Sequence, residues 1–125
     1  MAYAKFVSEK ILSVKFQWKN DKTALRFLST LDSTNYQGAG FIINGTYGTG
    51  TITNKERAIT KLYRSVVAAN QKAYPTVFSA DSQYFFVYTV RDMDPTLSSS
   101  WSITPYWITP DGTKVTGVTN TLIKQ

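Results

Sequence analysis

The sequence predicts a mainly β protein: an antiparallel β-sandwich, immunoglobulin-like or jelly-roll-like, with one short helix. Apolar residues make up 42% of the 125 residues, enough to form one core in a single domain, residues 1–125. Only 18% of residues are charged, while threonine, serine, glycine and tyrosine are frequent, as is typical of strands joined by polar turns. Several segments also alternate between apolar and polar residues, which is the period of a strand with one buried face.

The first elements expected are a hairpin and a third strand. Residues 12–18 and 25–31 alternate in this way and are separated by a polar turn at 19–22, which predicts two antiparallel strands. An apolar run at 38–43 predicts the next strand, and Asn44-Gly45 after it is the dipeptide best suited to a tight hairpin turn.

The middle of the chain predicts an edge strand and the helix. Residues 46–53 are rich in glycine and threonine, which favours a thin edge strand. Residues 54–69 then change period: Thr53 and Glu56 fit a capping box, and apolar residues from Ile59 onward recur every three to four positions, so a helix is expected. The same stretch also admits a strand that alternates through Ile59 and Tyr63.

The last third predicts three more strands. Residues 83–90 form a nearly continuous apolar and aromatic run, which is typical of a central strand covered on both faces. Residues 101–108 alternate again, and Pro105 favours a bulge or an edge position for that strand. Pro110-Asp111-Gly112 predicts a turn, and residues 114–118 predict the returning strand.

Strand parity then predicts the core. One side chain in two along these strands should face inward, between the two sheets. The expected core residues are Leu12, Val14, Phe16, Leu25, Phe27, Phe41, Phe86, Ile103 and Trp107.

Composition limits the chemistry. The chain has no cysteine and no histidine, which excludes disulfides, Cys/His zinc sites and histidine-based catalysis. Most acidic residues fall in predicted turns, where capping is their usual role, so we expect no enzyme activity, no cofactor and no metal. Asp92, Asp94 and Asp111 could approach one another as calcium ligands, but turn formation explains them better.

The net charge of +6 favours an acidic partner. Basic residues gather in residues 1–26 and 55–72, whereas residues 81–111 are mostly acidic. We therefore expect an interface that includes Lys5, Lys10 and Lys15, and either a partner protein or a second copy of the chain as its occupant. No apolar run is long enough to span a bilayer, and no secretion signal is visible.

Aromatic residues suggest a second kind of site. The three tryptophans follow the core parity, whereas Tyr36, Tyr47 and Tyr106 lie in loops or on the opposite parity and could stack on a sugar ring. Asn35 and Asn44 would bond the sugar hydroxyls. Binding of single-stranded nucleic acid is a third possibility, although the aromatic run at 83–90 lacks interleaved lysine or arginine.

Two segments, 25–41 and 84–117, resemble a poorly characterised β-sandwich accessory domain of secreted, cell-surface and phage-like proteins of clostridia. The resemblance implies a sandwich fold and a non-catalytic accessory role at a cell surface, in a virion or outside the cell. It rests on Arg26, Phe27, Asp32, Ser33, Tyr36, Gly40, Phe41, Tyr84, Phe85, Phe86, Pro95, Thr104, Pro105, Tyr106, Trp107, Asp111, Gly112 and Thr113.

These observations lead to an expected function. We expect a non-catalytic structural or adhesive module that binds protein or copies of itself. A carbohydrate-binding module is the alternative, and a nucleic-acid binder is the third reading.

Overall fold

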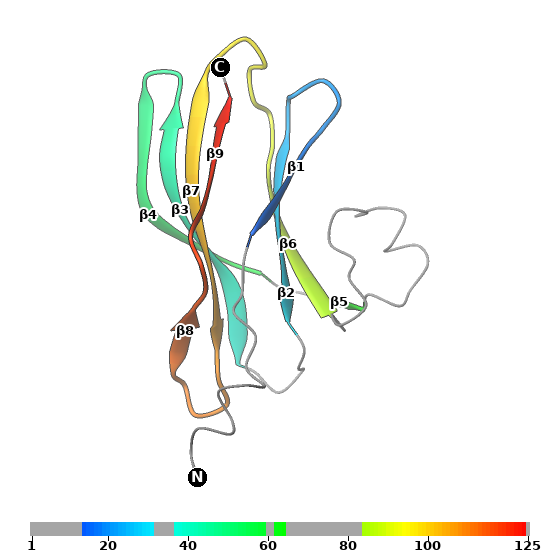
Figure 1. The fold of residues 1–125 in the computed structure, drawn as a ribbon, viewed down its shortest axis with the longest axis vertical. Helices are drawn as coiled ribbons and strands as arrows, with labels where there is room; N and C mark the ends of the chain where they lie inside the picture. The colour runs from blue at the N-terminus through cyan, green and yellow to red at the C-terminus, as the bar shows by residue number, and fades with distance from the viewer. Residues whose placement is uncertain (1–13, 32–36, 60–61, 65–83, 125) are drawn as a thin grey trace.

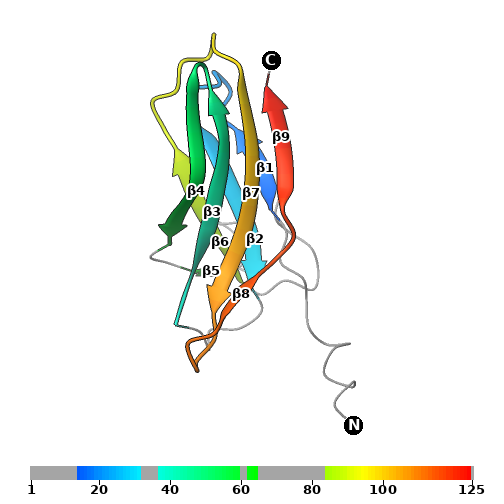
Figure 2. The same ribbon diagram turned by 90° about the vertical axis from the view of Figure 1, so that its left-hand side faces the viewer.

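A computed structural model describes residues 14–31, 37–59, 62–64 and 84–124. These residues form strands in two antiparallel sheets that pack face to face, as the two views in Figures 1 and 2 show. The expected sandwich architecture is therefore confirmed.

The first sheet, sheet A, has the strand order β1-β2-β6-β5. It is built from β1 (Lys15–Trp18), β2 (Leu25–Leu31), β5 (Tyr63–Arg64) and β6 (Tyr84–Val90). β1 and β2 form the predicted hairpin, and β2 and β6 are paired along their full length. As predicted, β6 is covered on both faces, because Phe85 and Phe86 point to opposite sides and both are fully buried.

The second sheet, sheet B, has β3 and β7 at its centre. Its strands are β3 (Gly38–Tyr47), β4 (Gly50–Ala58), β7 (Ser99–Ile108), β8 (Lys114–Thr116) and β9 (Asn120–Lys124). The order is β4-β3-β7, and both β8 and β9 pair with the far side of β7. Among the described residues, β4 is therefore one edge of the sheet, and β8 and β9 share the other.

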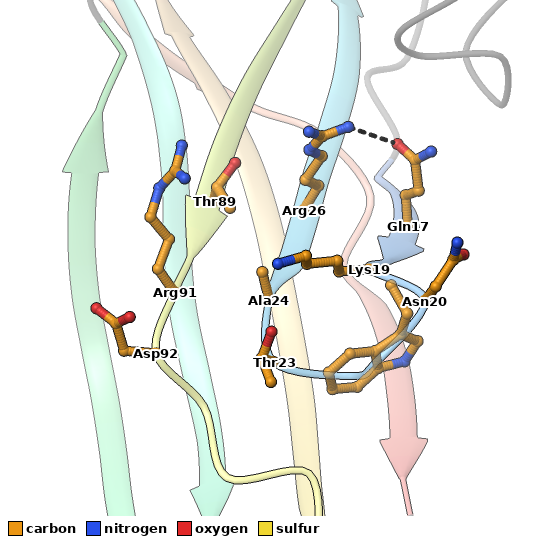
Figure 3. A pocket seen from close by; sticks show the side chains of 10 residues that line it. Gln17, Lys19, Asn20, Thr23, Ala24, Arg26, Thr89, Arg91 and Asp92 are labelled. Atoms are coloured by element: carbon orange, nitrogen blue, oxygen red, sulfur yellow. Dashed lines mark hydrogen bonds between the residues drawn. The ribbon is translucent and has the colours of Figure 1, made fainter.

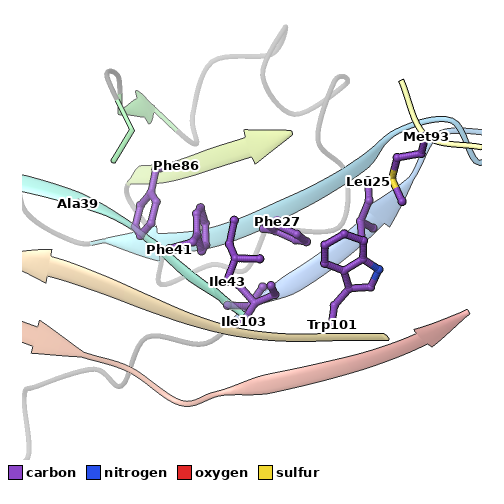
Figure 4. Packing of buried hydrophobic residues seen from close by; sticks show 10 residues of the cluster. Leu25, Phe27, Ala39, Phe41, Ile43, Phe86, Met93, Trp101 and Ile103 are labelled. Atoms are coloured by element: carbon purple, nitrogen blue, oxygen red, sulfur yellow. The ribbon is translucent and has the colours of Figure 1, made fainter. Parts of the chain in front are cut away.

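Between the sheets lies an aromatic core (Figure 4). Phe27 is at its centre, and its ring centroid lies 6.0 Å from that of Phe41 and 5.9 Å from that of Trp101. The expected core is largely confirmed, and Leu12 lies outside the described residues. Val14, Leu25, Phe27, Phe41, Phe86 and Ile103 are buried, while Phe16 and Trp107 are partly buried against them.

A smaller apolar cluster lies on the outer face of sheet A. Leu28 and Phe85 are fully buried there, with Tyr63 and Val87 packed against them. The rings of Tyr63 and Phe85 stack with centroids 5.3 Å apart. β5 is thus held to β6 by aromatic contact as well as by backbone pairing.

The expected helix at 54–69 is wrong where the structure describes that stretch. Residues 54–58 belong to β4, and Tyr63–Arg64 form β5, which agrees better with the alternative strand reading. Ile59 and Leu62 pack on the core from irregular backbone, so their spacing reflects burial and not a helical period. Residues 60–61 and 65–69 lie outside the described residues.

The expected turn at Asn44-Gly45 is also wrong. Both residues lie within β3, and the chain turns at residues 48–49, where Gly48 has a φ of 58°. The β3–β4 register shifts between Ile43 and Gly45, so Asn44 lies opposite a β-bulge whose extra residue is on β4. The Asn44 side chain accepts a hydrogen bond of 2.7 Å from the backbone of Asn54, whose φ is 48°. The Asn-Gly pair, which predicts a turn, therefore lies within a strand and opposite a bulge.

Pro105 was expected to mark a bulge or an edge strand, yet β7 is central and its register with β3 has no shift at Pro105. β7 pairs with β9 through Ile103 and with β8 from Tyr106 onward. The Pro105 carbonyl accepts a bond of 2.8 Å from Gly117, which lies between β8 and β9. In an antiparallel strand, the N–H and C=O groups of one residue point to the same side. The N–H that Pro105 lacks would therefore point to the place where β8 gives way to β9, so its absence costs no hydrogen bond of the sheet.

Candidate functional site

The proposed sugar-binding residues are placed apart. Asn35 and Tyr36 lie outside the described residues. Tyr47 is opposite Ser99 and Tyr106 is opposite Gly40, so the two tyrosines lie near opposite ends of β3 and β7, about 23 Å apart along the strands. The Asn44 side chain already accepts a hydrogen bond from the backbone N–H of Asn54. The described residues thus do not form a joint tyrosine platform.

Tyr47 supports a loop. Its side chain packs on the core, and its hydroxyl accepts a hydrogen bond from the backbone N–H of Asp94, in the connection between β6 and β7. Tyr47 therefore holds this connection against the end of β3.

Tyr106 lies on the outer face of sheet B, as parity predicts, but only 3% of its surface is exposed. Its ring covers Gly40, where an added Cβ would lie 2.8 Å from the hydroxyl. The Lys114 ammonium stands 4.7 Å from the ring centroid and 2.5 Å from the Glu56 carboxylate. Burial raises the pKa of Tyr106, and the Glu56 charge and hydrogen bond raise it further. The expectation that Tyr106 is exposed is therefore corrected.

Of the expected basic interface, the structure describes Lys15 alone, since Lys5 and Lys10 lie outside its ranges. Lys15 is exposed at the start of β1, an edge strand of sheet A. Every other edge strand in the described residues also carries a basic side chain: Arg64 on β5, Lys55 and Arg57 on β4, Lys114 on β8 and Lys124 on β9.

The longest of these edge strands is β4, and most of it is exposed. Of its nine residues, only Ile52 and Arg57 are partly buried. Beyond its end, Ile59 donates a backbone hydrogen bond of 2.9 Å to Ala39 on β3. Backbone N–H groups alternate in direction along a strand. The N–H groups of Arg57 and Lys55 therefore also point toward β3, while those of Glu56 and Ala58 point away from the sheet.

A cleft that the sequence did not indicate lies at the outer face of sheet A, beside the β1–β2 hairpin. It has a volume of about 390 Å³. Figure 3 shows the side chains that line one wall of the cleft, which are those of Gln17, Arg26, Thr89 and Arg91. Lys19 and Thr23 lie nearer the hairpin turn. Gln17, Arg26 and Thr89 are direct neighbours in the strand register. The full lining is Gln17, Trp18, Lys19, Asn20, Thr23, Ala24, Arg26, Thr89, Arg91 and Asp92.

Backbone contacts hold the cleft in shape. Lys19 donates a hydrogen bond of 2.9 Å to Ala24 across the turn, and Met93 donates one of 2.9 Å to Thr23. The second bond ties the end of β6 to the hairpin. Arg26 donates to the Gln17 side chain at 3.4 Å, which orients the amide in the cleft wall.

Two of the three aspartates that were candidate calcium ligands accept hydrogen bonds within their own turns instead. Asp94 accepts hydrogen bonds from Thr96, and Asp111 accepts them from Thr109 and Thr113. Asp21 bonds Thr23 in the same Asp-x-Thr arrangement. In each case hydrogen bonds from threonine are the main cause of a lowered aspartate pKa. No group of three potential metal ligands occurs within the described ranges.

Comparison with protein families, curated proteins and solved structures gives no match to this chain. The resemblance to the clostridial accessory domain therefore stays an expectation. In the part of the chain that is described, no helix has the length and apolarity required to cross a membrane.

Proposed function

We propose that this chain is a non-catalytic adhesive or structural module that binds a partner protein by adding a strand to the open edge of β4. The observation that carries the proposal is the exposure of β4 at seven of its nine residues, with the N–H groups of Glu56 and Ala58 directed away from β3. Such an edge supplies backbone hydrogen bonds to an extended segment, and side chains at its rim select the partner.

Charge favours an acidic partner over a second copy. If two β4 strands paired antiparallel about Glu56, Lys55 of each copy would stand opposite Arg57 of the other. Like charges placed directly across a pair of strands are destabilising. Glu56 is already paired with Lys114, so Lys55 and Arg57 determine the charge that a partner meets.

The test uses a short capped peptide of alternating glutamate and threonine, with alternating lysine and threonine as its charge-reversed control. We expect the acidic peptide to bind wild-type protein and Ala58→Val, which keeps the outward N–H. Ala58→Pro removes that donor at an edge, where proline is tolerated, and should abolish binding while the protein stays folded by circular dichroism.

Equal binding of both peptides, no binding at all, or unchanged binding by Ala58→Pro would overturn the proposal. A dimer in light scattering that is lost in Ala58→Pro would instead identify a second copy as the occupant.

Carbohydrate binding is the second candidate function. The cleft beside the β1–β2 hairpin favours it, because amide and hydroxyl side chains line its wall next to charged groups. Nothing in the described residues favours the third reading, single-stranded nucleic acid, over these two.

A further inference from the structure

The cleft beside the β1–β2 hairpin combines positive charge with neutral hydrogen-bonding groups. Lys19, Arg26 and Arg91 contribute three positive charges to its lining, and Asp92 contributes one negative charge. Lys19 is only loosely paired, with 3.7 Å to the exposed Asp21 carboxylate. For the exposed Arg91 guanidinium, no hydrogen bond or ion pair with another described residue is found. The lining therefore has a net positive charge, and the Arg91 guanidinium is available to an anion.

We propose that this cleft binds a sugar residue that carries a carboxylate. The inference deepens the carbohydrate-binding candidate and is independent of strand addition at β4, which lies on the other sheet. A guanidinium bonds a carboxylate through two parallel N–H groups, so Arg91 suits the acidic group of the sugar, and Arg26 adds positive charge to the lining.

The remaining lining fits the sugar hydroxyls. Each hydroxyl both donates and accepts, and it therefore needs amides, hydroxyls and carboxylates around it. Gln17, Asn20 and Thr89 offer both functions, and Asp92 adds an acceptor at the rim. The volume of about 390 Å³ lies within the usual range for small-ligand sites.

The lining counts against a single-stranded nucleic acid, because base stacking would need an open aromatic face. Trp18 is partly buried against the core, and the Lys22 ammonium stands 5.6 Å from its ring centroid. A sugar with a single carboxylate needs one cationic partner and hydrogen-bonding groups, and it does not need an open aromatic face.

The experiment titrates the intact chain with three monosaccharides that carry one carboxylate each, galacturonate, glucuronate and N-acetylneuraminate, following amide shifts by NMR. The methyl ester of each sugar is its uncharged control. We expect at least one acid to bind, with shifts at Gln17 and Thr89, and its ester to bind about tenfold more weakly or not at all.

Two matched variants separate a site from general charge attraction. Arg91→Gln should weaken binding of the acid about tenfold, whereas Arg57→Gln, which removes the same charge from sheet B, should change it less than about twofold. Equal losses in the two variants, equal affinity for acid and ester, or no shift with any of the three acids would overturn the proposal. Tighter binding of an oligothymidylate with the same Arg91 dependence would also overturn it, in favour of a nucleic acid.

Failure here is distinguishable from failure of the β4 proposal. The cleft variant Arg91→Gln should leave peptide binding unchanged, and Ala58→Pro should leave sugar binding unchanged. Loss of both activities in one variant would indicate misfolding, which circular dichroism of the same sample detects.

Discussion

The two sheets share one core but use their outer faces in different ways. The outer face of sheet A has an apolar cluster around Phe85 and, at the hairpin end, an open cationic cleft. On the outer face of sheet B, Tyr106 instead covers Gly40 and lies beneath Lys114, which is paired with Glu56. Strand alternation predicts which side chains point away from the core, but whether those side chains are exposed depends on the residues packed around them.

The largest expected effect tests the shared core. Phe27→Ala removes a fully buried ring that contacts both sheets, and the cavity should cost about 3 to 5 kcal/mol of unfolding free energy. Urea denaturation followed by tryptophan fluorescence measures it. Leu97→Ala, at a residue 38% exposed, is the control. A loss no larger than that of the control would show that the sheets do not pack through Phe27.

The next effect tests the covered face of sheet B. Gly40→Ala would place a Cβ 2.2 Å from the Arg57 carbonyl oxygen, so backbone must move, and we expect a loss of about 1 to 3 kcal/mol. Gly38→Ala is the matched control on the same face of β3. Its Cβ would meet only Ile108, at 3.6 Å, and stability should change little. Similar denaturation midpoints for the two variants would contradict the close cover of Gly40 by Tyr106 and β4.

A smaller effect concerns the charges above Tyr106. Glu56→Gln removes the negative charge that helps to raise the pKa of Tyr106, so that pKa should fall toward its ordinary value. It should remain raised, because burial is the larger cause and persists. Titration of tyrosinate absorbance, with Tyr106→Phe to identify the contribution, measures the shift. An unchanged titration would place Glu56 away from the hydroxyl.

The smallest effect concerns the turns at the strand ends. Hydrogen bonds from threonine lower the pKa values of Asp21, Asp94 and Asp111 in the folded state. A lowered folded pKa stabilises the protein above the unfolded value near 3.8, and this contribution is lost as the pH falls through the folded pKa. Replacing all three aspartates by asparagine should therefore flatten the decline of the urea midpoint below that pH. If the urea midpoint of the triple variant declined at low pH as it does in the wild type, the acid sensitivity would come from other carboxylates.

Local pattern predicted the strands well and the exceptions poorly. β2 was predicted with its observed bounds, because alternation over 25–31 matches burial of Leu25 and Phe27. The Asn44-Gly45 turn failed because Asn44 lies at a register shift in the β3–β4 pair and the chain turns later, at residues 48–49. The helix at 54–69 failed, where the structure describes that stretch, because residues 54–58 pair with β3 and residues 63–64 pair with the distant β6. The bulge or edge expected at Pro105 failed because β7 changes its neighbour there from β9 to β8, which the local sequence does not show.

The site was harder to predict than the fold. The sequence placed Tyr106 on the outer face correctly but could not show that Gly40 lies beneath it. The cleft was missed because Gln17, Arg26 and Thr89 come from three strands that are adjacent only in the folded sheet. The available signal was parity: Thr89 and Arg91 lie two residues apart, on the face of sheet A turned away from the core.

Residue-resolved amide hydrogen exchange along β4 tests the central claim of an open edge most directly. In the isolated chain, the amides of Arg57 and Ile59 should be protected by β3, while those of Glu56 and Ala58 should exchange freely. Addition of the acidic peptide should protect Glu56 and Ala58. Uniform protection of β4 in the isolated chain, or no gain at Glu56 and Ala58 when the peptide binds, would contradict the account.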